Sequence, residues 1–295
     1  MVDKQKIGWI GLGKMGNPMS KNLIKAGYKL GVYDIMKENV EELIKLGASN
    51  PDSLKKLAAD SEIVISMIPN DKVLENISIS PEGIFEGLNR GTIYIDMSTV
   101  SPAVSARVSK IAEAKGITYL RAPVSGSTAL AADGKLTIFV SGPKDAYEQC
   151  LQMFLSMGQK SFYVGEGEQA RYLKLVLNIM VGLTAAVTAE ALSFGEKGGM
   201  DWNQMIDIVI NSVVASPLII YKAHALREHN FTPAFTADQM AKDFNIILGT
   251  GKDMGLPLPM VSMVHQYLLD MKSLDRGNLD FFGLLTLWEE MSNVS

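Results

Sequence analysis

A lysine and an asparagine lie within the apolar stretch between Gly165 and Gly199, and the lysine could do acid–base chemistry. The stretch contains no proline, and its apolar residues recur at helical intervals, so we expect one long helix. Lys174 and Asn178 are four residues apart and therefore share one face of it. A lysine in such surroundings either extends its ammonium to the helix edge or is held in a pocket as a proton-transfer group. The helix alone favours the first alternative.

A glycine-rich turn near the N-terminus has the composition of a phosphate-binding loop. Residues 6–10 form a short β-like run that opens directly into GLGKMG at positions 11–16, and an amphipathic segment, residues 17–26, follows. Gly11 permits a tight turn, Gly13 lets the backbone approach a pyrophosphate, and Gly16 lets the helix pack close to the strand. A lone GxGxxG is weak evidence, but its place between a strand and a helix indicates a dinucleotide site with the phosphates at the helix N-terminus.

Asp34 follows the second strand of this unit, residues 30–33. It lies eighteen positions after Gly16, about where an acidic residue accepts hydrogen bonds from the adenosine ribose. A carboxylate there repels a 2′-phosphate, so NAD is favoured as cofactor. NADP stays possible because Lys37 is close enough to soften that preference. The alternative interpretation of Asp34 is an ordinary turn residue before a helix.

Strands and helices alternate up to residue 164, and then the strand pattern disappears. Near-continuous apolar runs are typical of a parallel sheet covered on both faces, and they lie at residues 63–67, 93–96, 118–120, 136–141 and 161–164. After the long helix come only helical patterns, at residues 202–214, 217–228, 236–254, 259–274 and 280–291. We therefore predict an α/β fold: a Rossmann-type dinucleotide-binding domain over residues 1–164 and an all-α domain for substrate binding and oligomerisation over residues 165–295.

Two loops of the predicted sheet are further candidates for cofactor binding. Ligands of such sheets bind outside the carboxyl ends of the strands. The loop of Met67, Ile68 and Pro69 follows one strand, and Thr99 follows another. The alternative is plain turn and helix-capping chemistry.

The composition argues against several other classes of function. The net charge is −4, from 28 basic and 32 acidic residues that are interspersed, which favours neither nucleic acid nor a membrane surface as partner. The single cysteine, Cys150, excludes an internal disulfide framework, and the three histidines lack the spacing of a helical zinc pair, so we expect no metal. No apolar secretory segment precedes the first strand, and polar residues interrupt the most apolar run. We therefore expect a cytoplasmic protein without a membrane span.

Five motifs in order resemble the β-hydroxyacid dehydrogenase family, which contains 3-hydroxyisobutyrate dehydrogenase and related glyoxylate and semialdehyde reductases. The resemblance covers essentially the whole chain. It rests on GLGKMGNPM at 11–19, DMST at 96–99, PVSG at 123–126, the stretch from Gly167 through Lys174 to Asn178, and KD at 242–243 with GLPLP at 255–259. It implies reversible, NAD(P)-dependent oxidation of a small 3-hydroxy acid to its aldehyde or keto acid.

The resemblance also implies roles for individual residues. Lys174 is similar to the catalytic lysine, and Asn178 to the amide that helps to hold the substrate. Ser125 and Gly126 resemble the loop that anchors the substrate carboxylate, with a tight turn as the alternative. Lys242 matches a lysine at the mouth of the cofactor cleft, although a solvated helix face explains it almost as well. The expected cofactor-binding set is Gly11, Leu12, Gly13, Met15, Gly16, Asp34, Met67, Ile68, Pro69, Thr99 and Lys242.

The chain departs from the family pattern at several positions. Counting back from Asn178 identifies Lys174 as the catalytic lysine, whereas counting forward from Gly167 leads to Arg171. We favour Lys174, because it shares a helix face with Asn178 and because arginine is poorly suited to proton transfer. An arginine, Arg121, replaces the usual acidic residue before APVSG; it could bind a second acidic group of the substrate or pair on the surface. Two expected loop glycines are Ser127 and Leu130.

Two rival interpretations use the same scaffold. One is a catalytically inactive member that binds a dinucleotide and a partner protein. The other is an imine reductase or a dehydrogenase of phosphorylated sugar acids, although the latter usually has a longer helical portion and a basic phosphate pocket, and the sequence shows neither. In each case the apolar faces of the long helix must be covered, so we expect a homodimer or homotetramer.

Overall fold

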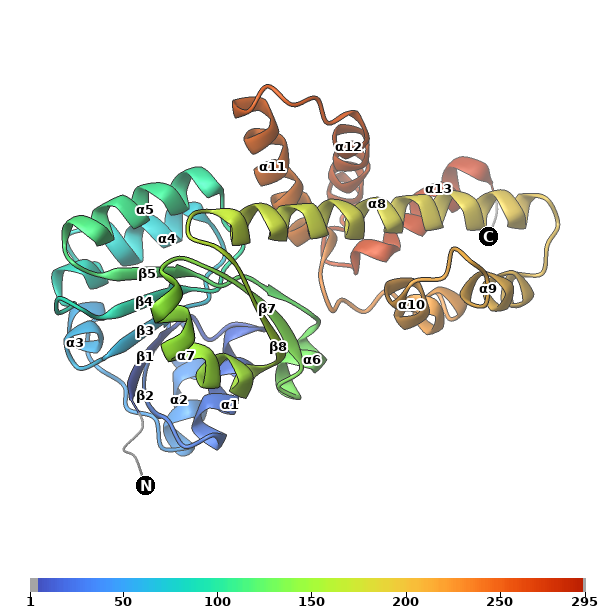
Figure 1. The fold of residues 1–295 in the computed structure, drawn as a ribbon. Helices are drawn as coiled ribbons and strands as arrows, with labels where there is room; N and C mark the ends of the chain where they lie inside the picture. Colours follow the sequence, from blue (N-terminus) through green and yellow to red (C-terminus); the bar gives the residue numbers. More distant parts are fainter. Residues whose placement is uncertain (1–4, 294–295) are drawn as a thin grey trace. The chain divides into compact units, whose positions relative to one another are not determined.

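The computed structural model describes residues 5–293 (Figure 1). The chain divides into two compact units, Met1–Lys174 and Leu175–Ser295. We call them unit 1 and unit 2 and describe each by itself. The domain boundary expected after residue 164 stays a prediction.

Unit 1 is built on a mixed sheet. Its strand order is β2-β1-β3-β4-β5-β7-β6, and β8 pairs with β7. The strands are β1 Lys6–Ile10, β2 Lys29–Tyr33, β3 Ile63–Ser66, β4 Ile93–Asp96, β5 Thr118–Arg121, β6 Val124–Ser125, β7 Leu136–Ser141 and β8 Gly158–Gly165. The strands β1 to β5 pair in parallel, as the apolar runs predict.

The expectation of a wholly parallel sheet is wrong at one end. The strand β7 runs antiparallel to β5 and β6, and β8 runs parallel to β7. Only residues 126–135 join β6 to β7. A parallel crossover needs roughly a dozen residues or more, so this connection reverses the chain instead.

Helices cover both faces of the sheet (Figure 1). One apolar core contains residues of α1 Gly16–Lys25, α2 Lys37–Lys45, α6 Thr128–Ala132 and α7 Lys144–Met157. The other contains residues of α3 Leu54–Ala59, α4 Asp71–Ile79, η1 Ile84–Glu86 and α5 Pro102–Ala114. Burial on both faces explains why the strands are nearly continuous apolar runs.

Four short elements of unit 1 were not predicted from the sequence: α4, η1, β6 and α6. In α4 the buried positions are Leu74, Ile77 and Ser78, and polar residues separate them, so the apolar period is weak. The start of α4 nevertheless has a signal, because the Asn70 side chain accepts a hydrogen bond from the Val73 N–H at 3.0 Å. Asn70 is therefore the residue that caps the start of α4.

The long helix α8 spans Gln169–Lys197 and contains 29 residues. It begins four residues after the expected start and ends two before the expected end, because Gly165 and Gly199 have φ values of +138° and +83° that an α-helix does not accommodate. Among residues 5–293, α8 is long and apolar enough to pass a length-and-composition test for a membrane span. Core helices of soluble proteins pass the same test, so the expected absence of a membrane partner stays a prediction.

Unit 2 is helical, as the loss of strand patterning predicts. Besides its part of α8 it contains α9 Trp202–Ile210, α10 Pro217–Arg227, α11 Ala237–Asp253, α12 Pro259–Ser273, η2 Phe281–Leu284 and α13 Leu285–Ser292. Its core gathers residues of all these elements, among them Phe244, Leu268 and Leu285. A buried ion pair of 2.7 Å between Lys222 and Asp280 joins α10 to the start of η2. The predicted fold class, an α/β unit followed by an all-α unit, is confirmed.

Candidate active site

The glycine turn after β1 leaves room for a ligand at one position only. Gly11 has φ +90°, and a Cβ there would lie 2.2 Å from the Met67 carbonyl oxygen. A Cβ at Gly16 would lie 2.0 Å from the Gly11 carbonyl oxygen. Gly13, by contrast, would meet nothing within 4 Å. The first and third glycines therefore serve close packing, and the second leaves the backbone open to an approaching group.

Asp34 is bound to this turn. Its Oδ2 accepts a hydrogen bond from the Leu12 N–H at 2.6 Å, and its Oδ1 accepts one from the Met36 N–H at 2.7 Å. Each carboxylate oxygen has a second lone pair, so both can still accept a ribose hydroxyl. The Trp9 indole supports the turn as well, because its Nε1 donates to the Gly11 carbonyl at 2.8 Å. The sequence analysis did not single out Trp9.

The loops after β3 and β4 lie against each other, as the parallel topology predicts. The Met67 N–H donates to the Ile10 carbonyl at 2.9 Å, and the Ile68 N–H donates to the Ser98 Oγ at 2.8 Å. Pro69 is exposed, and Thr99 is half-buried. The predicted cofactor residues at positions 67–69 are thus beside Gly11, and the DMST loop is beside Ile68.

Ser125 ends β6, and Gly126 begins the turn that follows it. Ser125 is half-buried. Gly126 has φ +140°, and a Cβ there would clash with a Leu136 methyl at 2.7 Å. Ser127 ends this turn as the cap of α6, since its Oγ accepts from the Leu130 N–H at 3.3 Å. The two departures from the family pattern thus build a short helix after the turn.

Arg121 is buried and does not pair on the surface, so that alternative is wrong. Its Nε donates to the Glu168 Oε1 at 2.8 Å, and its guanidinium lies 4.8 Å from the centre of the Tyr119 ring. A charged group in a buried site requires such a partner, and Glu168, directly before α8, provides it. Glu168 therefore already compensates the positive charge of Arg121 that would be needed to bind a second acidic group of the substrate.

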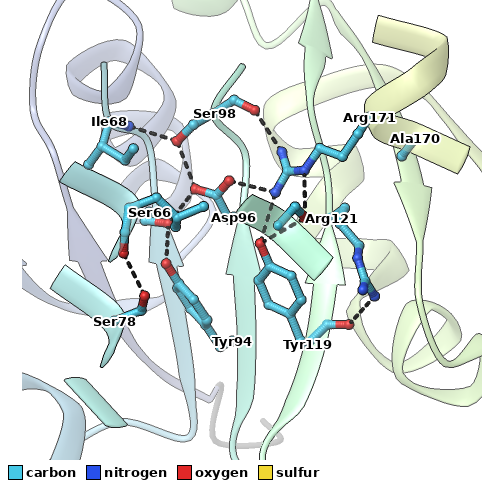
Figure 2. Close-up of polar contacts among 12 residues, drawn as sticks. Ser66, Ile68, Ser78, Tyr94, Asp96, Ser98, Tyr119, Arg121, Ala170 and Arg171 are labelled. Carbon is cyan, nitrogen blue, oxygen red and sulfur yellow. Dashed lines mark hydrogen bonds and ion pairs between the residues drawn. The ribbon is translucent and has the colours of Figure 1, made fainter. Parts of the chain in front are cut away.

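Arg171, in the first turn of α8, is almost completely buried, with 1% of its surface exposed, and so is its partner Asp96 at 0%. Figure 2 shows its guanidinium beside Asp96, Ser98 and Tyr119. Its Nη2 lies 2.6 Å from the Asp96 Oδ2 and 3.0 Å from the Tyr119 hydroxyl, and its Nη1 lies 2.7 Å from the Ser98 carbonyl. Its Nε donates to the Ser105 Oγ at 3.1 Å.

The protonation state of Arg171 follows from these neighbours. Burial disfavours the charged guanidinium, but Tyr119 and Asp96 outweigh burial and raise the pKa of Arg171 above its ordinary value. Burial likewise raises the pKa of the Tyr119 hydroxyl, although Arg171 opposes this. Arg171 therefore stays charged and Tyr119 stays neutral over the physiological range of pH.

Lys174 lies one turn further along α8 and is only partly buried. With a rise of about 1.5 Å per residue, it is about 4.5 Å along the helix axis from Arg171. Since Arg171 bonds the Ser98 carbonyl, this turn of α8 begins directly at the DMST loop. The sequence singles out Arg171 and Lys174 as alternatives, but no pattern in it identifies Asp96, Tyr119 or Ser105 as partners of Arg171.

In unit 2, Asn178 is buried and its amide is oriented by Asp243. The Asn178 Nδ2 donates to the Asp243 Oδ2 at 2.5 Å, and the Lys242 Nζ lies 2.7 Å from the Asp243 Oδ1. Asp243 is 1% exposed, so this acid on the inner face of α11 is the centre of the group. The sequence analysis named Lys242 and Asn178 but not Asp243 as a site residue. Its signal was an acidic residue within the apolar period of α11.

No group of three or more histidine, cysteine, aspartate or glutamate residues that could hold a metal ion is found among residues 5–293. The absence of a metal stays an expectation. The polar groups that the candidate site does offer belong to three parts of the chain. They are the glycine turn after β1, which we call the dinucleotide turn, the loops after β3 and β4, which we call the cofactor-side loops, and α8.

Comparison with known proteins decides the family. Residues 6–165, more than half of the chain, match the family described as the NAD-binding domain of 6-phosphogluconate dehydrogenase. Residues 167–288 match the NAD-binding family of NADP-dependent 3-hydroxyisobutyrate dehydrogenase. The chain is also 34% identical over 291 residues to 2-(hydroxymethyl)glutarate dehydrogenase of Eubacterium barkeri, covering 98% of this chain and 97% of the relative. The chain belongs to the β-hydroxyacid dehydrogenase family.

As a β-hydroxyacid dehydrogenase, the protein is an NAD(P)-dependent oxidoreductase of hydroxy acids. Its fold is similar to that of Mycobacterium tuberculosis 3-hydroxyisobutyrate dehydrogenase with L-serine, at a TM-score of 0.89 and 23% identity, covering 96% of this chain and 98% of that one. It is also 30% identical over 276 residues to the cytokine-like nuclear factor N-PAC of Xenopus tropicalis, covering 94% of this chain and 52% of N-PAC.

The residues present in this β-hydroxyacid dehydrogenase fit a dinucleotide. Gly13 leaves open space for the approach of a pyrophosphate, and the first turn of α1 contains no acidic residue that would repel it. The Asp34 carboxylate is fixed at the end of β2 with lone pairs available for ribose hydroxyls. The individual cofactor contacts stay predictions.

Proposed function

We propose that this β-hydroxyacid dehydrogenase interconverts a small 3-hydroxy acid and its semialdehyde or keto acid, with Lys174 as the proton-transfer group. The observation that carries the proposal is the enclosure of Arg171 by Asp96, Ser98, Ser105 and Tyr119. An arginine held in this way and kept charged cannot exchange a proton with a substrate. Lys174 is then the ionisable side chain on that part of α8 which is suited to the task.

The proposed chemistry divides between cofactor and protein. Bound NAD(P) accepts the hydride of the alcohol in oxidation and returns it in reduction. The Lys174 amine takes the hydroxyl proton in oxidation, and its ammonium donates that proton to the carbonyl oxygen in reduction. A free lysine is mostly protonated at neutral pH, so the oxidative role requires surroundings that disfavour the ammonium.

Substrate orientation is proposed for Ser125, Gly126 and Asn178. The Ser125 hydroxyl and the Gly126 N–H would bind the substrate carboxylate, and Asn178 would hold a substrate oxygen. Asp243 supports this role for Asn178, because it accepts from the amide nitrogen and so leaves the amide oxygen in a defined orientation. Two comparisons support a 3-hydroxy acid: 2-(hydroxymethyl)glutarate and L-serine both carry a hydroxyl on the carbon β to a carboxylate.

A cofactor and substrate screen tests the proposal. Purified protein is mixed with NAD or NADP and a panel of small 3-hydroxy acids, and with NADH or NADPH and the matching semialdehydes, while nicotinamide absorbance is followed. We expect turnover of at least one 3-hydroxy acid with a preference for NAD, because Asp34 repels a 2′-phosphate. Turnover of 2-hydroxy acids alone would refute the substrate class.

A second candidate function is dinucleotide binding without turnover. The similarity to N-PAC favours it, because that relative is described as a nuclear factor and the chain spans about half of it. Tight binding of NADH, measured by its fluorescence, with no turnover across the whole panel would support this alternative.

Subunit number and location are also proposals. We propose a homodimer or homotetramer in the cytoplasm. Exposed apolar residues of α8 support the oligomer; they are Val176, Met180, Val187 and Phe194. The last three repeat every seven residues and so form one stripe along the helix. Light scattering of the protein and of Phe194→Glu tests it, and a monomeric parent protein would refute it.

A further inference from the structure

Arg171 holds the first turn of α8 at three separate elements. Its acceptors are Asp96 and Ser98 at the end of β4, Ser105 on α5, and Tyr119 on β5. Figure 2 shows three of these acceptors, Asp96, Ser98 and Tyr119, around the guanidinium. Donors pointing in several fixed directions define both the position and the rotation of the side chain, which a lysine ammonium cannot do.

The same network reaches the cofactor-side loops. The Asp96 Oδ1 accepts from the Ser98 Oγ at 2.7 Å and from the Ser66 Oγ at 2.6 Å, while Oδ2 faces Arg171. Ser98 in turn accepts from the Ile68 N–H at 2.8 Å. A continuous chain of hydrogen bonds therefore runs from the loop after β3, through the loop after β4, to α8.

A neighbouring contact fixes the same turn. The Ala170 N–H donates to the Ser141 Oγ at the end of β7, at 3.2 Å. The start of α8 is thus attached to the carboxyl end of β4 through Arg171 and to that of β7 through Ala170. Stability alone does not explain the buried ion pair between Arg171 and Asp96, since well-packed apolar residues often stabilise a fold equally well.

We propose that Arg171 is a positioning residue, which fixes α8 against the cofactor-side loops and so sets the position of Lys174. The inference rests on the proposed role of Lys174. Lys174 is three residues from Arg171, so a change in the tilt or rotation of this turn moves it directly. Misplacement of a reacting group by about 1 Å can cost about 100-fold in rate.

Arg171→Lys is the first test, because it keeps the charge but removes the planar fork. We expect kcat to fall by about tenfold to 100-fold while the KM for the cofactor stays within about twofold. Hydrogen exchange at the amides of residues 169–175 should accelerate. Unchanged kcat in the folded variant would overturn the proposal, and so would unchanged exchange.

A matched pair of milder variants covers the case in which Arg171→Lys does not fold. Tyr119→Phe removes one acceptor of Arg171, whereas Tyr94→Phe removes a hydroxyl of the neighbouring strand that contacts Ser66 at 2.8 Å and not Arg171. Both tyrosines are buried. We expect lower kcat and faster exchange in α8 for Tyr119→Phe, and a smaller effect for Tyr94→Phe. Equal effects would show that Arg171 is only structural.

The experiment separates this inference from the proposed function. If Lys174→Ala retains turnover, the role of Lys174 fails, and the lower kcat predicted for Arg171→Lys loses its basis. Hydrogen exchange does not depend on turnover, so it still reports whether Arg171 fixes α8. If exchange changes in Arg171→Lys but kcat does not while Lys174→Ala is inactive, the positioning role alone fails.

Discussion

Arg171 and Lys174 lie three residues apart on α8, yet they differ in burial. Arg171 is 1% exposed, is bonded to four other residues, and has its pKa raised. Lys174 is only partly buried. A guanidinium that is enclosed by acceptors and stays charged can define geometry but cannot exchange a proton with a substrate. The difference is consistent with our proposal that one turn of α8 separates an anchoring residue, Arg171, from a reacting one, Lys174.

Removal of the Lys174 side chain should have the largest effect on activity. Lys174→Ala should lower kcat by about 10²–10⁴-fold, the usual contribution of a general acid–base group. Binding of NADH, measured by fluorescence titration, should change less than about twofold, since the dinucleotide turn is untouched. Loss of turnover in Arg171→Ala, with turnover kept in Lys174→Ala, would reverse the assignment.

For stability the order should be reversed: a substitution of Arg171 should destabilise the protein more than one of Lys174. Arg171→Met leaves Asp96 buried without its partner, and we expect a loss of about 3–5 kcal/mol in the free energy of unfolding of unit 1. Lys174→Met should cost less than about 1 kcal/mol, because the side chain is partly exposed. Urea unfolding followed by the fluorescence of buried Trp9 measures both. Equal losses would show that the two environments do not differ as described.

Asp34 tests whether cofactor binding is separable from both residues. Asp34→Ala removes the carboxylate that we propose accepts hydrogen bonds from the ribose, so we expect NAD binding to weaken by about tenfold to 100-fold. Binding of NADP should weaken less, because the repulsion of its 2′-phosphate is also removed. The dissociation constants of the two reduced cofactors are compared by fluorescence. An equal loss for both would refute the ribose role.

We expect the smallest effect from a substitution in the glycine turn. Gly13→Ala should leave the thermal midpoint unchanged, since its Cβ would meet nothing within 4 Å, but should weaken NADH binding by about tenfold, roughly one lost close contact. Gly16→Ala is the matched control, because its Cβ would lie 2.0 Å from the Gly11 carbonyl oxygen and should destabilise unit 1. Weaker binding without destabilisation in both variants would contradict the assignment of Gly16 to packing.

The sequence predicted those parts of the fold that local patterns determine. The βαβ unit around Gly11 and Asp34, the long helix and the helical second half have strong periodicity or fixed glycine positions, and the structure confirms them. The antiparallel direction of β7 was missed because it depends on the reversal in residues 126–135, directly after the two-residue strand β6. The capped helix α4 was missed because its apolar period is weak.

The candidate site was predictable only where residues of one motif lie together. The partners of Arg171 come from 52 to 75 positions away in the chain, and no periodicity links Ser105 or Tyr119 to α8. The same holds for Arg121, whose burial depends on Glu168, 47 positions away. Long-range pairing of polar side chains is determined by packing, so sequence patterns alone could name these residues but not their partners.

Chemical rescue tests the central claim most directly. Lys174→Ala is supplied with small primary amines of different basicity, and hydride transfer is followed by nicotinamide absorbance. If the missing group is a proton-transfer amine, we expect turnover to rise with amine concentration and to follow amine basicity, whereas guanidine should have no effect. Restoration of turnover in Arg171→Ala by guanidine, without any rescue of Lys174→Ala by amines, would contradict the account.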